Sequence, residues 1–94
     1  MKNIIESNYD SIVRRGLITP STTKREFIDK LFEEVDEFEC CYTENAGEIN
    51  NEELADIILV CFNIAKHYNI DIEQELKDKI NINYGRVDSN TEGI

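Results

Sequence analysis

A long apolar stripe at helical spacing is the feature that most limits how this chain can fold. It lies within residues 24–42 and consists of Phe27, Ile28, Leu31, Phe32, Val35, Phe38 and Tyr42. Apolar side chains that recur every three or four positions share one face of an α-helix. No segment shows the strict apolar and polar alternation of a half-buried strand, and one proline and four glycines leave few breaks. We therefore predict an all-α fold.

Four helices account for most of the chain. We expect them over residues 4–14, 24–42, 51–68 and 71–84. Three pairs have the spacing of N-terminal caps: Thr23 with Glu26, Asn50 with Glu53, and Asp71 with Gln74. Gly16 is placed to end the first helix and Gly85 to end the last. We predict a four-helix bundle in a single domain, residues 1–94, completed by self-association and followed by a flexible tail over 87–94.

The chain is strongly acidic, with a net charge of −10 and a pI near 4.4. Binding to nucleic acid polymers or anionic membranes requires basic patches, so neither is an expected partner. No signal peptide is visible, and the longest apolar run, residues 57–62, is far shorter than the roughly 20 residues that span a bilayer. We expect a soluble, cytoplasmic protein.

The three cysteines are an odd number and form no CxxC or cysteine–histidine spacing. We predict that Cys40, Cys41 and Cys61 are free thiols in a reducing compartment and pack as small buried hydrophobes. A catalytic thiol is the alternative. A chain of this length buries only a little over ~60% of its unfolded surface, so self-association is expected as well.

Two carboxylate clusters stand out within the predicted helices. The first is Glu33-Glu34-x-x-Glu37, and the second is Glu53-x-x-Asp56. Acids three residues apart project from one side of a helix, so two facing helices would bring four carboxylates into one small volume. Like charges at that density repel unless a cation lies between them, and oxygen ligands suit magnesium or manganese. The clusters predict a divalent-metal site.

Helical geometry orders the acids of the first cluster. On the helix expected over 24–42, Glu34 borders the apolar stripe and Glu37 lies about 60° further round. Both can face a neighbouring helix, whereas Asp36 points to water. Glu33 is intermediate, and we expect it to support the site or to orient a water molecule.

The second cluster lies on the most apolar helix. Glu53 falls on the same line as Val60 and Ile64, which should point into the protein. A charge there is unfavourable unless it is paired or bound to metal. Asp56 lies about 60° round from Glu53, beside Asn63, so the inward polar spot holds two carboxylates and an amide. The alternative is that these acids are ordinary solvated surface.

A third polar group lies on the last helix, where Lys79, Asn83 and Arg86 fall within about 60° of one another. Two cations and an amide suit phosphate oxygens and a sugar or base edge. The alternative is a solvated stripe that complements the negative end of the helix. His67, the one histidine, is expected to be a surface group at the end of its helix.

These residues resemble the MazG-like nucleoside triphosphate pyrophosphohydrolases, an all-α group that includes the dimeric dUTPases. The motif EExxE, a spacer, ExxD and a later Lys, Asn and Arg pattern correspond here to Glu33-Glu34-x-x-Glu37, Glu53-x-x-Asp56 and Lys79-x-x-x-Asn83-x-x-Arg86. The resemblance covers residues 24–86, which would form the core of the MazG fold.

The resemblance implies a four-helix core completed by a homodimer or homotetramer. It implies Mg²⁺-dependent cleavage of a nucleotide between its α and β phosphates, with Mn²⁺ as a possible substitute, to give a monophosphate and pyrophosphate and so remove abnormal nucleotides. Glu34, Glu37, Glu53 and Asp56 would be the metal ligands, with Glu33 as a catalytic support. Substrate contacts would come from Lys79, Asn83 and Arg86.

Three other interpretations compete with this one. The chain could be a non-catalytic helical module that assembles or regulates other proteins, in which case it needs no metal. It could be a catalytically silent relative that binds a nucleotide without turnover. A di-iron bundle fits least, because neither acid cluster has a histidine at Glu-x-x-His spacing.

Overall fold

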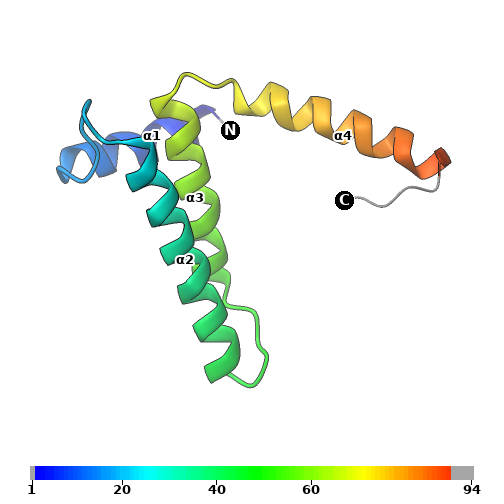
Figure 1. The fold of residues 1–94 in the computed structure, drawn as a ribbon, viewed down its shortest axis with the longest axis horizontal. Coiled ribbons are helices and arrows are strands. Elements are labelled where there is room, and N and C mark those ends of the chain that lie inside the picture. Colours follow the sequence, from blue (N-terminus) through cyan, green and yellow to red (C-terminus); the bar gives the residue numbers. More distant parts are fainter. Residues whose placement is uncertain (1, 90–94) are drawn as a thin grey trace.

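The structure is a computed structural model that describes residues 2–89, and these form four α-helices (Figure 1). The helices are α1 (Lys2–Arg14), α2 (Lys24–Glu44), α3 (Asn51–His67) and α4 (Ile72–Ser89). No strand occurs among the described residues. The predicted all-α class is therefore confirmed. None of these helices is both long and apolar enough to cross a lipid bilayer.

The helices begin where their capping residues predict. Three side-chain oxygens accept the N–H three residues on: Thr23 from Glu26 at 3.1 Å, Asn50 from Glu53 at 2.9 Å, and Asp71 from Gln74 at 3.1 Å. After α1, Gly16 adopts φ +74° and donates its N–H to Val13 O at 2.9 Å. A left-handed glycine with this bond is a common helix ending, as predicted.

The predicted end of the last helix is wrong, because α4 continues through Gly85 to Ser89. A glycine inside a helix costs only about 1 kcal/mol relative to alanine, and here that does not stop the helix. The predicted tail over 87–94 thus begins with three helical residues, and its remainder lies outside the described residues.

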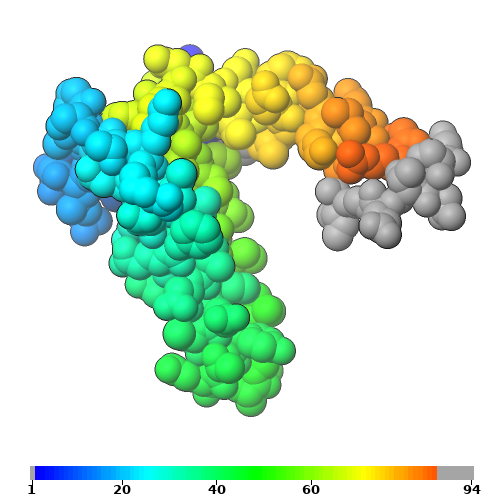
Figure 2. All heavy atoms as spheres, viewed as in Figure 1, coloured from blue at the N-terminus to red at the C-terminus, as the bar shows by residue number. Residues whose placement is uncertain are grey.

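Three helices pack together and the fourth extends away from them. α2 and α3 run antiparallel, α1 packs on α3 near the start of α2, and α4 leads off from the end of α3 (Figure 1). Figure 2 shows the resulting two arms, one made by α2 and α3 and the other by α4. The α-carbon radius of gyration is 15.8 Å, whereas a compact 94-residue domain has about 12 Å. One chain alone does not close into a compact bundle.

The core is small and lies where α1, α2 and α3 meet. Its buried hydrophobic side chains are Ile18, Phe27, Val60 and Ala65. His67 joins this core, because its ring lies 4.8 Å from that of Phe27 and its Nδ1 is 2.9 Å from the hydroxyl of Tyr9. The prediction that His67 is a surface group is wrong. Local spacing could not reveal these contacts, because the aromatic residues around His67 come from three separate segments of the chain.

Many apolar side chains of the predicted stripes remain exposed. Phe32 on α2 is 65% exposed and Tyr84 on α4 is 72% exposed. Cys40 and Cys61 are exposed and Cys41 is half-buried, so the predicted burial of the cysteines is wrong for the single chain, although all three are free thiols. Isolated apolar residues on a surface are ordinary, but a continuous apolar face marks an interaction surface.

Candidate metal centre

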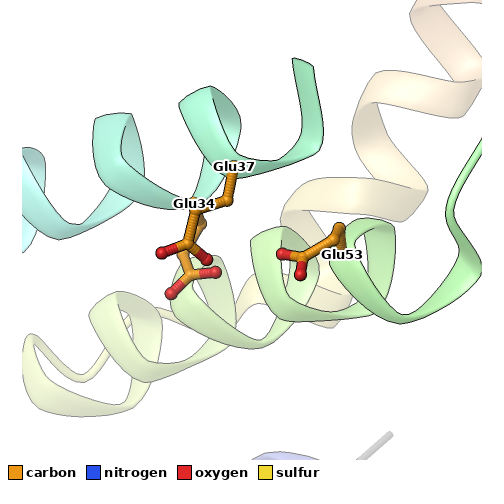
Figure 3. Close-up of side chains that lie close together, drawn as sticks. All are labelled: Glu34, Glu37 and Glu53. Atoms are coloured by element: carbon orange, nitrogen blue, oxygen red, sulfur yellow. The ribbon is translucent and has the colours of Figure 1, made fainter. Parts of the chain in front are cut away.

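Three glutamates converge between α2 and α3. Glu34 and Glu37 extend from α2, and Glu53 faces them from α3 (Figure 3). One carboxylate oxygen from each lies within 4.8 Å of the others. The largest ligand separation around an octahedral Mg²⁺ is about 4.2 Å, twice its metal–oxygen distance. Small side-chain rotations would therefore bring the three oxygens to one ion.

Two of these carboxylates carry an oxygen that has no partner. Glu34 is only 7% exposed, and its buried Oε2 accepts no hydrogen bond; the same holds for the buried Oε2 of Glu53. A buried carboxylate oxygen without a donor is strongly unfavourable, and a bound cation would remove that penalty. The donor set consists of carboxylates alone, which fits a hard divalent ion.

The sequence interpretation overlooked Lys30, the cation nearest to the cluster. Its Nζ lies 3.1 Å from an oxygen of Glu34 and 3.5 Å from an oxygen of Glu33. The hydrogen bond to Glu34 raises the pKa of Lys30, which keeps the ammonium charged. Lys30 precedes Glu34 by four residues, a spacing that favours an ion pair and was visible in the sequence. It neutralises one oxygen of Glu34 and leaves the other unpaired.

The pKa of Glu37 reflects the repulsion between the carboxylates of the cluster. This pKa is raised above the ordinary value, chiefly by the negative charge of Glu34 and then by burial and the charges of Glu53 and Glu33. A raised carboxyl pKa means that the ionised form is held in an unfavourable field. A divalent cation between the three acids would offset the negative charges around Glu37 and favour its ionised form.

The other two predicted acids lie beside the cluster, outside its centre. Asp56 is exposed and does not join the three converging carboxylates, so the structure unites three of the four predicted ligands. Asp56 and Glu33 both line a cavity that also includes Glu34. Asp56 and Glu33 thus lie beside the three converging glutamates, along the wall that they share with Glu34.

This cavity has a volume of about 530 Å³ and lies between α1, α2 and α3. Apolar side chains line much of it, and Asn8 donates a 2.8 Å hydrogen bond to the buried Asn63 within it. The sequence placed Asn63 beside Asp56 but gave no role to Asn8. Nothing in the spacing of α1 residues identified that contact, because it joins positions 55 residues apart.

The predicted phosphate-binding residues are not brought to the acids within one chain. Lys79, Asn83 and Arg86 lie on α4, which extends away from α2 and α3 (Figure 1), and no α4 residue lines the cavity beside the acids. Asn83 is half-buried and its Oδ1 has no hydrogen-bond partner. The three residues do share one side of a continuous helix, as their spacing predicts.

Comparisons with protein-family models, with curated proteins and with solved structures found no match to this chain. The resemblance to MazG-like enzymes therefore depends on the motifs of the sequence.

Proposed function

We propose that this protein is a Mg²⁺-dependent nucleoside triphosphate pyrophosphohydrolase. It would cleave the anhydride between the α and β phosphates to give a nucleoside monophosphate and pyrophosphate, and so remove unwanted nucleotides. The observation that carries the proposal is the convergence of Glu34, Glu37 and Glu53 with two buried, unpaired carboxylate oxygens. Among common ligands, a divalent cation satisfies that arrangement best.

The metal would be held by Glu34, Glu37 and Glu53, with Asp56 as the fourth ligand after rotation of its exposed side chain. Bound Mg²⁺ or Mn²⁺ supplies charge neutralisation on the phosphates and lowers the pKa of a coordinated water. Because the chain carries a net charge of −10, it needs such a cation to accept an anionic substrate.

The remaining residues would position the reactants. Glu33, exposed beside the cluster, would hold the attacking water and accept its proton. The water oxygen adds to phosphorus, the bond to the bridging oxygen breaks, and pyrophosphate leaves. Lys30, already charged and next to Glu34, would face the phosphates and stabilise the negative charge that develops on them.

A second copy of the chain would complete the bundle, as a homodimer or homotetramer. The exposed apolar side chains of α2 and α4, the extended shape and the small core all favour such an assembly. Assembly would also allow Lys79, Asn83 and Arg86 of one copy to reach the acids of the other. The free thiols fit a reducing compartment, so we place the protein in the cytoplasm.

Pyrophosphate release tests the proposal. The purified protein is incubated with canonical and modified nucleoside triphosphates, with Mg²⁺ or with a chelator, and pyrophosphate is measured. We expect Mg²⁺-dependent release that Glu34→Gln reduces at least 100-fold. Glu52→Gln is the matched control, because Glu52 is an exposed acid beside Glu53 that lies outside the cluster. Equal turnover by wild type and Glu34→Gln would contradict the proposal.

A non-catalytic helical module is the second candidate, and the exposed apolar face favours it. The two candidates differ in their need for metal. A module that only assembles would form the same oligomer with a chelator as with Mg²⁺, and would release no pyrophosphate from any nucleotide.

A further inference from the structure

The net negative charge of this chain comes from one segment, which begins directly after Lys30. Residues 31–65 hold ten of the twenty Asp and Glu side chains and no Lys or Arg. The rest of the chain is electrically balanced, because it holds the other ten acids and all ten bases. The converging glutamates Glu34, Glu37 and Glu53 all belong to the acidic segment. Any positive charge beside them therefore comes from outside the segment.

Lys30 supplies such a charge. Its Nζ lies 3.1 Å from Oε1 of Glu34 and 3.5 Å from Oε1 of Glu33. The Glu34 side chain is only 9% exposed, so this ion pair neutralises a carboxylate that water hardly reaches. The negative charge of Glu34 chiefly raises the pKa of Glu37, and the positive charge of Lys30 partly offsets that rise. Lys30 thus performs part of the role of a bound cation.

The pairing of Glu34 is incomplete, which allows a second cation to compete for it. Oε2 of Glu34 is buried and accepts no hydrogen bond, although Oε1 is paired with Lys30. A divalent ion on Oε2 would lie close to the ammonium on Oε1, and like charges repel at such short range. The Lys30 side chain is 51% exposed and has a flexible four-carbon stem, so it can move aside. Binding of the ion therefore favours departure of the ammonium.

The cavity beside the acids offers Lys30 a second position. Lys30 lines this cavity together with Glu33, Glu34 and Asp56. A phosphate that coordinates an ion at Glu34 would lie next to the carboxylate that Lys30 leaves. An ammonium group has three donors and binds phosphate oxygens as a point charge. The same side chain can thus serve the acids first and the phosphate afterwards.

We propose that Lys30 is the resident cation of this site: it pairs with Glu34 until a divalent ion displaces it, and it then turns to the phosphates of the substrate. The inference rests on the proposed function, which supplies the ion and the phosphates. Lys30 is a positioning residue that acts through Glu34, and it also sets the metal affinity, because the ion binds only where it outcompetes the ammonium. Phosphate binding follows metal binding for the same reason.

Calorimetric titration of Lys30→Met tests the inference, first with Mn²⁺ alone and then with methyl phosphate at saturating Mn²⁺, all at one ionic strength. Methionine has a helix propensity similar to that of lysine but carries no charge. We expect Lys30→Met to bind Mn²⁺ roughly ten times more tightly than the wild type. It should bind methyl phosphate roughly five times more weakly. A merely structural ion pair predicts no gain in metal affinity, because its loss would leave Glu34 less well placed.

Two variants serve as controls. Lys24→Met removes one positive charge from the same helix at an exposed position outside the cavity, so both affinities should stay close to those of the wild type. Lys30→Arg keeps the charge and should retain the weaker, wild-type affinity for Mn²⁺. If circular dichroism shows that Lys30→Met has lost its helices, Lys30→Gln takes its place with the same expected changes.

Two results would overturn the inference. One is a folded Lys30→Met, or a folded Lys30→Gln in its place, that binds Mn²⁺ no more tightly than the wild type. The other is the same variant with an unchanged affinity for methyl phosphate. Failure of the proposed function is distinct, because a wild type that binds Mn²⁺ but releases no pyrophosphate loses the hydrolase and keeps Lys30 as the competing cation. Pyrophosphate release with an unchanged Mn²⁺ affinity in Lys30→Met keeps the hydrolase and removes the inference.

Discussion

Replacing Glu53 with glutamine should change stability in opposite directions without and with metal. In the wild type, a carboxylate oxygen of Glu53 lies within 4.8 Å of one from Glu34, and the buried Oε2 of Glu53 has no partner. Unit charges 4.8 Å apart repel by about 0.9 kcal/mol in a medium as polar as water, and by about 3.5 kcal/mol at an effective dielectric constant of 20. Glu53 is half-buried and Lys30 pairs with Glu34, so the lower figure is the better guide.

Glu53→Gln should therefore stabilise the metal-free protein by about 1 kcal/mol, which raises Tm by about 4–8 °C for a domain of this size. With Mn²⁺ at 100 times its Kd, the wild type should gain about 2.7 kcal/mol from binding. The variant lacks one of three converging ligands and should gain little. The order of the two melting temperatures is thus expected to reverse when Mn²⁺ replaces the chelator.

Thermal unfolding followed by circular dichroism measures both effects, at one fixed protein concentration because self-association shifts Tm. Glu52→Gln is the control: it removes an exposed acid from the same first turn of α3. It should lose about 0.3–1 kcal/mol of helix-dipole stabilisation in both conditions and respond to Mn²⁺ like the wild type. The reasoning is refuted if Glu53→Gln is less stable than the wild type with chelator, or equally stabilised by Mn²⁺.

Three further outcomes follow from the same structure. Because Glu37 has a pKa raised above the ordinary 4.5, the folded protein binds this proton more tightly than the unfolded chain does. As pH falls through that raised pKa towards 4.5, the metal-free protein should gain stability from this group while its Mn²⁺ affinity drops. Both trends should flatten in Glu37→Gln, measured by thermal unfolding and calorimetry. Phe32→Asp puts a charge on the exposed apolar face of α2 and should lower the molar mass seen by light scattering, whereas an unchanged mass would place the interface elsewhere. Asn50→Ala removes the cap of α3 and should reduce urea stability by about 0.5–2 kcal/mol, with weaker Mn²⁺ binding because Glu53 lies in that first turn.

The four helices and the residues at which they begin could be predicted from the sequence, because both depend on interactions between residues close together in the chain. Thr23, Asn50 and Asp71 cap helices as their spacing predicts, since each bond joins residues three positions apart. Helix ends were harder to predict. Gly85 is predicted to end the last helix, but a glycine inside a helix costs only about 1 kcal/mol, and α4 continues past it. The departure of α4 from the other helices depends on the chain's turn after α3 and had no local signal.

The candidate site was predicted in part, for a similar reason. Helical periodicity predicted that Glu34 and Glu37 share one face of their helix and that Glu53 points inward from the neighbouring helix. In the structure the three carboxylates converge. Asp56 lies at the cavity wall because its position depends on how α3 is rotated against α2, which three-residue spacing does not define. Asn8 was missed because its partner is distant in sequence.

X-ray diffraction from crystals grown with Mn²⁺, with the anomalous signal of manganese recorded, tests the central claim most directly. We predict an anomalous peak between the carboxylates of Glu34, Glu37 and Glu53, within about 2.5 Å of an oxygen from each. A crystal at saturating Mn²⁺ with no peak at that position, and with the three side chains turned apart into solvent, would contradict the account.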